Sequence, residues 1–287
     1  MAEPTQGRST PRRGTTCGKK SDMTRKLVGV LLFAMTCMTG CDAVSSEPTY
    51  GGLSIAGFNY TPYNLSRFVI TDEYGNSASG GGDLMPGSGE GSLSCCYSLK
   101  GTEFTVKWQV YDADEAIRSL DAGERIQKIS KTTHVHLPPT KIKGEAGMRV
   151  LGLHFYPDDH VEFEFRTDLR GSRIYYVDIW DWLRKTHKKL INPSGDHSSV
   201  EFRRTARHAA NGWIKYHFTH TKDLQQYVYF TLLNPRFDQH PDIQQIIAET
   251  KDKPGAFGAA MENLSTSIVK ELKQNKFRKS ATGENHD

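Results

Sequence analysis

The sequence predicts a mainly β, α+β fold, in which an antiparallel, sandwich-like β body is followed by C-terminal helices. Three observations support this fold class. Several short segments alternate apolar and polar residues with the period of a half-buried strand. Clusters of Gly, Pro, Asn and Asp separate these segments and predict tight turns. Beyond residue 240, apolar residues recur at helical spacing.

Composition and charge restrict the possible functions. The chain has 287 residues, of which 37% are hydrophobic and 10% aromatic, so it can build a packed core. Its formal charge of +4 arises in the first 40 residues, which hold seven basic and two acidic side chains, and the rest is close to neutral. Because nucleic-acid binding needs a concentrated positive face, nucleic acid is not an expected partner.

The N-terminal residues predict a lipoprotein signal peptide over 23–40. Residues 1–22 are interpreted as a leader or a misassigned start, with Met23 as the more natural initiator. A short positive stretch precedes the apolar run Leu27–Thr36, which is too short to span a bilayer, where roughly 20 residues are needed. An ordinary signal peptide, or a cytosolic protein with an apolar start, are the alternatives.

The end of this segment, Met38-Thr39-Gly40-Cys41, resembles the bacterial lipobox. The resemblance implies cleavage before Cys41 and acylation of that cysteine with fatty acids such as palmitate. Several acyl chains anchor a protein stably, at about 0.8 kcal/mol per buried methylene. Residues 41–50 would then be a lipidated tether, and the protein would lie on the periplasmic face of the inner or outer membrane of a bacterial cell envelope.

Residues 51–240 are predicted to form the β-rich domain. In Glu103–Tyr111 the side chains of Phe104, Val106, Trp108 and Val110 alternate onto one face. The turn Pro157-Asp158-Asp159 predicts the clearest hairpin of the chain. The strands expected before residue 170 are Leu53–Tyr60, Ser66–Thr71, Leu93–Leu99, Glu103–Tyr111, Thr133–Leu137, Arg149–Tyr156 and His160–Arg166. Further extended segments are expected at Ser199–Thr205, Asn211–Thr219 and Tyr227–Leu233.

Other segments of this domain do not read as strands. Gly75–Ser92 is predicted to be a long Gly/Ser loop, and it is not a phosphate cradle because no Gly-Lys-Ser/Thr motif follows it. Residues 112–131 are helix-compatible, with a loop near Asp121. Tyr176–Lys188 is interpreted either as a helix or as an aromatic loop.

The C-terminal helical segment is predicted to span 241–274. His240-Pro241-Asp242 begins a helix, because proline favours the first helical turn. Pro254-Gly255 breaks it, and Ala259–Gln274 is expected to be a second amphipathic helix. Residues 275–287 are expected to be a disordered tail.

Cleavage and acylation at Cys41 would leave only the adjacent pair Cys95 and Cys96 in an oxidising compartment. Two states of this pair stay open: a disulfide between neighbours, or two free thiols buried on alternate sides of a strand. A metal site is not expected, because adjacent thiols do not easily occupy two corners of a tetrahedron.

No catalytic constellation is recognisable in the sequence. It contains no G-x-S-x-G, H-E-x-x-H or C-x-x-C motif. We therefore predict no catalytic residue, no cofactor and no metal, and we do not expect an enzyme. A metal site built from His134, His136, His154 and His160 is the weaker alternative, because no third ligand has motif spacing.

Tryptophans are the candidate partner-binding residues. Asp178 and Asp181 lie beside indole side chains, a combination known from sugar hydrolysis, but packing of the aromatic cluster is the preferred interpretation. Since aromatic anchors dominate protein interfaces, Trp180, Trp182 and Trp213 are predicted to contact a partner.

Four motifs carry a family resemblance: Ile55–Thr61 (IAGFNYT), Gly80-Gly81-Gly82, Cys95-Cys96 followed by Tyr97-Ser98-Leu99, and Val106-Lys107-Trp108. In this order they resemble the bacterial lipoproteins classed as domain of unknown function 3304, over roughly residues 50–240. Some of these lie beside genes for phospholipase effectors of type VI secretion and look like periplasmic immunity proteins. The resemblance implies no catalytic residue.

The expected function is that of a membrane-anchored periplasmic lipoprotein that binds and neutralises a phospholipase effector. The alternatives are an envelope scaffold lipoprotein without a toxin partner and, less favoured, a metal-binding envelope enzyme.

The lipobox predicts that Cys41→Ala releases the protein from the membrane fraction, because the acceptor of the acyl chains is lost. Fractionation and intact mass of the purified protein check this. Continued membrane binding of the variant, or a wild-type mass without acyl groups, would contradict the prediction.

Overall fold

The structure is a computed structural model that describes residues 47–275 except 90–93, 147 and 169–171. The chain divides into two compact units, residues 1–45 and 46–287, and the description below concerns the second. The predicted signal peptide, Cys41 and the tail 276–287 therefore lie outside the described residues. Among the helices that are described, none is long and apolar enough to cross a membrane.

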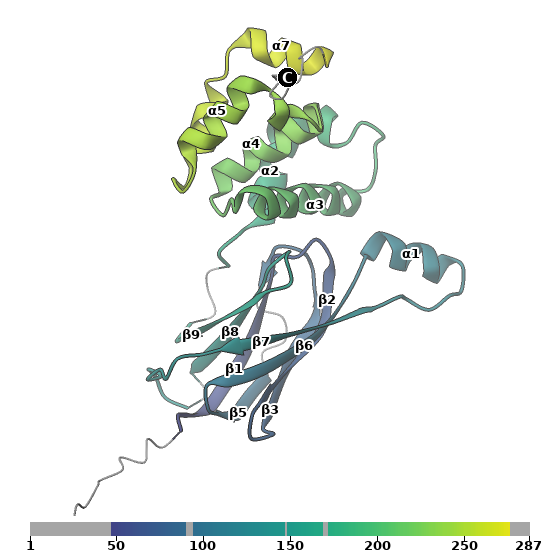
Figure 1. The fold of residues 1–287 in the computed structure, drawn as a ribbon. Helices are drawn as coiled ribbons and strands as arrows, with labels where there is room; N and C mark the ends of the chain where they lie inside the picture. The colour runs from purple at the N-terminus through teal and green to yellow at the C-terminus, as the bar shows by residue number, and fades with distance from the viewer. Residues whose placement is uncertain (1–46, 90–93, 147, 169–171, 276–287) are drawn as a thin grey trace, which may run out of the picture. The chain divides into compact units, whose positions relative to one another are not determined.

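Within the described residues the strands form a five-stranded and a four-stranded sheet (Figure 1). The first contains β1 (Thr49–Asn59), β4 (Ser88–Gly89), β5 (Ser94–Lys100), β8 (Arg149–Phe155) and β9 (Val161–Arg166). The second contains β2 (Asn64–Asp72), β3 (Ser77–Leu84), β6 (Glu103–Tyr111) and β7 (Ile129–His136), in the order β3-β2-β6-β7. All strand neighbours are antiparallel except β1 and β8. The α+β prediction with an antiparallel, sandwich-like body is confirmed.

A hydrophobic core lies between the two sheets. From the second sheet it takes Phe104, Val106, Trp108 and Val110, which are at most 2% exposed, so the predicted inward face of β6 is confirmed. From the first sheet it takes side chains of β1 and β8, among them Ile55, Leu153 and Phe155. The predicted hairpin of β8 and β9 also forms, and Val161, Phe163 and Phe165 pack on this core.

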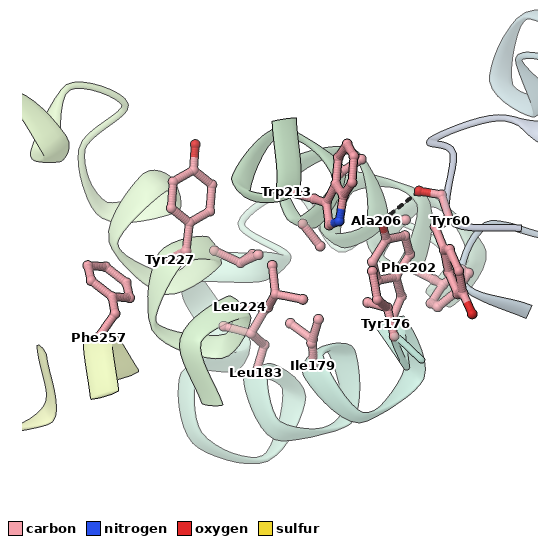
Figure 2. Packing of buried hydrophobic residues seen from close by; sticks show 14 of the residues in the cluster. Tyr60, Tyr176, Ile179, Leu183, Phe202, Ala206, Trp213, Leu224, Tyr227 and Phe257 are labelled. Carbon is pink, nitrogen blue, oxygen red and sulfur yellow. Dashed lines mark hydrogen bonds between the residues drawn. The ribbon is translucent and has the colours of Figure 1, made fainter. Parts of the chain in front are cut away.

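The parallel pair β1–β8 is buried on both faces. Alternate residues of each strand face away from the sandwich and join a second core with the helices, among them Ala56, Phe58 and Val150. Figure 2 shows Tyr60, at the end of β1, beside Tyr176, whose hydroxyl donates a 2.7 Å hydrogen bond to the Tyr60 carbonyl oxygen. Double burial is typical of parallel strands, whose residues read as a continuous apolar run.

The helices fall into one insertion and one C-terminal group (Figure 1). Helix α1 (Ala113–Asp121) lies between β6 and β7, as residues 112–131 predicted. The others are α2 (Tyr176–Ile191), α3 (Ser198–Tyr216), α4 (Thr221–Leu233), α5 (Pro241–Thr250), α6 (Ala256–Glu262) and α7 (Thr266–Gln274), with a 3-10 turn η1 (Phe237–Gln239). The predicted start of α5 at Pro241 is confirmed, and the His240 side chain accepts from the Asp242 amide at 3.3 Å.

The extended segments predicted beyond residue 190 are wrong. Ser199–Thr205 and Asn211–Thr219 fall largely within α3, and Tyr227–Leu233 is the second half of α4. The run YVYFTLL is apolar because α4 is buried on several sides, and a short apolar run does not distinguish a buried helix from a strand. The predicted β-rich stretch 51–240 thus contains strands only up to Arg166, and the C-terminal group of helices begins at Tyr176 instead of residue 241.

The predicted Gly/Ser loop Gly75–Ser92 is also wrong, because it contains β3 and β4. The glycines of β3 allow close packing against β2; they do not form a turn. A Cβ on Gly80 would lie 2.5 Å from Cζ of Phe68, and one on Gly81, whose φ is +124°, would lie 2.6 Å from the Cα of Arg67. The strand can therefore approach β2 only without side chains at these positions.

The predicted single helix Ala259–Gln274 is two helices. The chain leaves the helical conformation after α6, and Ser265 restarts it by accepting a hydrogen bond from the Ile268 amide at 3.4 Å. Side-chain capping of this kind satisfies an amide that has no partner inside the helix.

We predict that Gly80→Ala destabilises the fold by about 1–3 kcal/mol, because its methyl group would press on the buried Phe68 ring. Urea denaturation of the purified protein measures this. Ser77→Ala, at an exposed position of the same strand, is the control and should change the free energy of unfolding by less than about 0.5 kcal/mol. Equal effects of the two substitutions would contradict the prediction.

Candidate protein-binding surface

The helix-facing side of β1, β8 and β9 carries a network of polar side chains, here called the His154 network. It comprises Tyr60, His154, Tyr156, Glu162, Glu164 and Arg173. Alternation along the strands places it there, since His154 and Tyr156 are two residues apart, as are Glu162 and Glu164.

His154 is the centre of the network and is fully buried. Its ring stacks on Phe58 at 4.7 Å between ring centroids. Nδ1 lies 2.9 Å from the Tyr60 hydroxyl and Nε2 lies 2.8 Å from Oε2 of Glu164. The Tyr60 oxygen also accepts from the Arg173 amide at 2.8 Å. A neutral ring with its proton on Nε2 satisfies all of these bonds, with Tyr60 donating to Nδ1.

The charged and polar groups of the network are paired with one another. Burial, and next the charge of Arg173, lower the pKa of His154 to about 4. Burial raises the pKa of Tyr156 to about 12, and that hydroxyl accepts from Arg173 at 2.7 Å. Burial alone would raise the pKa of Glu162, but its ion pair with Arg173 lowers it. Because every member is committed to another, the network holds the strands to the following segment and offers no activated nucleophile.

An open apolar groove of about 280 Å³ is lined by residues of β2, α1, α2 and α3 and by the turn before β4. Its wall is largely aliphatic and aromatic, and two of its side chains are strongly exposed: Met85 at 56% and Val177 at 47%. Within it, Trp180 packs edge-on against Phe202 at 5.8 Å, and the guanidinium of Arg184 lies 4.7 Å from the centre of the Trp180 ring. The lining residues are Asn64, Met85, Pro86, Ala113, Val177, Trp180, Ser198, Ser199, Phe202 and Arg203.

Helix α1 continues the apolar surface beyond the groove. Ala113 lines the groove, and Ile117 and Leu120 follow at helical spacing with 48% and 60% exposure. A pair of arginines on α3 fixes the start of α1: Arg203 Nε donates to Asp114 at 2.7 Å and Arg207 Nη1 at 2.9 Å. These arginines outweigh burial and lower the pKa of Asp114. We call the groove together with Ile117 and Leu120 the Trp180 surface.

The three predicted tryptophans do not form one surface. Trp180 lines the groove, but Trp182 packs on His187 and Tyr229, with centroids 5.1 and 6.4 Å away. Trp213 is only 5% exposed and lies against Tyr156 at 5.0 Å. Trp180 alone of the three lines the groove, and Trp213 is buried, while contact of the half-buried Trp182 with a partner stays a prediction. Sequence reasoning did not single out Val177 or Leu120 as surface residues, although the helical spacing of Ala113, Ile117 and Leu120 is the signal that could have found the apolar face of α1.

The four histidines of the alternative metal site are not brought together. His134 and His136 are exposed on β7 and contact Thr105 and Glu103, whereas His154 is buried in its network. His160 stacks on Tyr156 at 4.3 Å. Among the described residues, no three His, Cys, Asp or Glu side chains are placed to hold a metal ion.

A larger hollow of about 550 Å³ lies beside the end of α3 and α5. Two of its charged side chains, Asp223 and Lys215, already serve the fold. Asp223 accepts from the amides of Gly255 and Gly258, both at 2.7 Å, and so caps α6, while Lys215 pairs with Asp238 at 2.8 Å. The Trp180 surface, with its exposed apolar side chains, is therefore the better candidate for binding a partner.

Comparison with known families supports the resemblance carried by the sequence motifs. The family model described as "Protein of unknown function (DUF3304)" matches residues 58–163 and places this segment in that domain family. The match runs from the end of β1 into β9, so it is shorter than the expected 50–240 and leaves α2–α7 outside. Comparisons with curated proteins and with solved structures gave no match for this chain.

Burial of neutral His154 predicts a pH-dependent stability. Its pKa is about 4 in the folded protein and about 6.5 in the unfolded chain, so the unfolded chain takes up the proton first. Its contribution is therefore complete above about pH 6.5 and is lost as the pH falls toward 4, by up to roughly 3 kcal/mol.

Urea denaturation at pH 7.5, 6 and 5 of wild type and His154→Gln measures this contribution. In the variant, the free energy of unfolding should fall less steeply below pH 6.5 than in wild type. His208→Gln is the matched comparison. Burial also lowers the pKa of His208 to about 4, so this variant should likewise lose part of the fall in stability below pH 6.5. An unchanged pH dependence in His154→Gln would show that folding does not shift the pKa of His154, and would contradict the prediction.

Proposed function

We propose that this protein is a membrane-anchored periplasmic lipoprotein that binds and neutralises a phospholipase effector of type VI secretion. The observation that carries the proposal is the Trp180 surface, which is exposed and apolar, on a body with a DUF3304 segment and with a lipobox-like motif upstream. A tether at Cys41 would hold the protein on the side of the membrane where an incoming lipase acts.

The Trp180 surface suits an anchoring role in a larger interface. A stable protein complex buries about 1,600 Å² in total, with roughly 20–30 residues on each side, whereas only ten residues line the groove. The groove therefore accepts one or two apolar side chains of the effector, and Ile117 and Leu120 extend the contact. Inhibition at nanomolar affinity requires about 12 kcal/mol, most of which a few such anchors can provide.

Charge at the rim indicates what surrounds these anchors on the effector. Arg184 borders the groove with a side chain that is 41% exposed, whereas Arg203 is already paired with Asp114. An acidic side chain next to the inserted apolar group would complement Arg184. Such complementarity favours the correct partner and speeds its association.

The experiment reads the genes next to this one for a phospholipase effector, and expresses such a lipase in the periplasm of a heterologous host with and without this protein. We expect growth to be restored by the full chain, and we expect the purified pair to form a one-to-one complex. No protection and no binding would overturn the proposal. Capture of envelope assembly proteins without any lipase would instead favour the scaffold alternative.

A matched pair of substitutions tests the surface. Val177→Asp places a charge in the groove and should weaken effector binding by about 30- to 1,000-fold, as expected for an anchor worth 2–4 kcal/mol. Val69→Asp, on β2 with 37% exposure and outside the groove, should leave binding unchanged. Isothermal calorimetry measures both, and tight binding by Val177→Asp would exclude the groove as the anchor.

A further inference from the structure

Cys95 and Cys96 lie near the start of β5 and are joined by a disulfide. Both side chains are exposed, so the alternative of two thiols buried on opposite sides of a strand does not hold. Residues 1–45 contain the other cysteines, and this pair is the only one in the described part of the chain. Neither the His154 network nor the Trp180 surface includes it.

The two cysteines form a β-bulge. Between the pairs Leu53↔Tyr97 and Ile55↔Ser94, β1 contributes one residue, Ser54, and β5 contributes two, Cys95 and Cys96. Cys96 has φ +75°, a conformation that residues other than glycine seldom adopt. The disulfide ring thus coincides with the position where β5 departs from regular pairing.

A second bulge on β1 restores the register. Between Gly51↔Ser98 and Leu53↔Tyr97 the extra residue is Gly52, which has φ +67°. Beyond it, regular pairing resumes from Ser98 to Lys100, and Leu99 is buried. The Lys100 amide donates to Asp72 at 2.7 Å. The C-terminal half of β5 is therefore held by burial and regular pairing, independently of the cysteines.

The N-terminal half of β5 has fewer attachments. Strand β5 pairs with β1 alone, and in its N-terminal half only Ser94 and Tyr97 have a partner residue on β1. Tyr97 reaches β3, with its hydroxyl 3.2 Å from Oγ of Ser79. Edge strands with irregular pairing open more easily than central ones.

We propose that Cys95–Cys96 is a thiol–disulfide exchange site, open to a dithiol reductant in the folded protein, whose bond state controls the attachment of residues 94–97 to β1. One thiolate of the reductant attacks a cysteine sulfur, the Sγ–Sγ bond breaks, and the displaced thiolate takes up a proton. The second reductant thiol then attacks the mixed disulfide and releases the other cysteine as a thiol. Two electrons pass to the protein, and the reductant leaves as its own disulfide. This inference does not depend on the proposed effector partner.

The first test compares reduction of the folded and the unfolded full chain. The protein is treated with dithiothreitol, quenched with iodoacetamide, and the peptide that contains Cys95 and Cys96 is quantified by mass spectrometry. For an exposed site, the rate in buffer should be within about tenfold of the rate in guanidinium chloride. Reduction that requires global unfolding would be slower by about 10³-fold or more, and that result would overturn the proposal.

The second test measures the effect on β5 by amide hydrogen exchange. Reduction should speed exchange of residues 94–97 at least about tenfold while residues 98–100 keep their protection. The double variant Cys95→Ser, Cys96→Ser should show the same fast exchange without reductant and no response to it. Equal protection of residues 94–97 in the oxidised and reduced proteins would overturn the claim that the disulfide controls their attachment to β1. The reduced protein should also bind one equivalent of phenylarsine oxide at this pair, and the double variant should not.

Discussion

The rest of the structure depends on the parallel pairing of β1 with β8. Side chains on one face of this pair fill the core between the two sheets, and side chains on the other face join the helical core. Both cores therefore share two strands, and the hydrophobic burial of one supports the other. Antiparallel sandwiches usually leave their outer face to water, so the double burial of β1 and β8 explains why the helices belong to the same compact unit.

Because the helix-facing side of β1 and β8 is buried, its polar side chains must form hydrogen bonds with one another instead of with water. His154 is neutral there at neutral pH because burial, and next the charge of Arg173, lower its pKa more than Glu164 raises it, and the neutral ring still finds a partner for each nitrogen in Tyr60 and Glu164. Arg173 supplies the cation that the glutamates of β9 need. The strongest concentration of perturbed groups in the described residues is thus a structural junction. The exposed apolar side chains of the Trp180 surface are different, because no contact within the described residues accounts for their exposure.

Sequence patterns predict an element correctly when they arise from residues close together in the chain, and fail when they arise from contacts with distant residues. In β6, alternation of Phe104, Val106, Trp108 and Val110 requires only one sheet face to be buried, and it was read correctly. In α4, Val228 and Phe230 are buried together with Leu224 and Tyr227, so no polar face marks the helix and the segment looked extended. In β3, glycines suggested a loop because the ring of Phe68, which makes glycine necessary, lies on another strand.

Local alternation and local turn residues are enough to predict the α+β class, most strands of the sandwich and the motifs of the DUF3304 segment. The folded structure is needed to see where the C-terminal helices begin, that Trp180 and not Trp213 lies at an open surface, and that His154 is enclosed in a network. These features depend on contacts between residues far apart in the chain, such as Trp180 with Phe202 and Tyr60 with His154. Periodicity carries no information about which distant side chain a residue will meet.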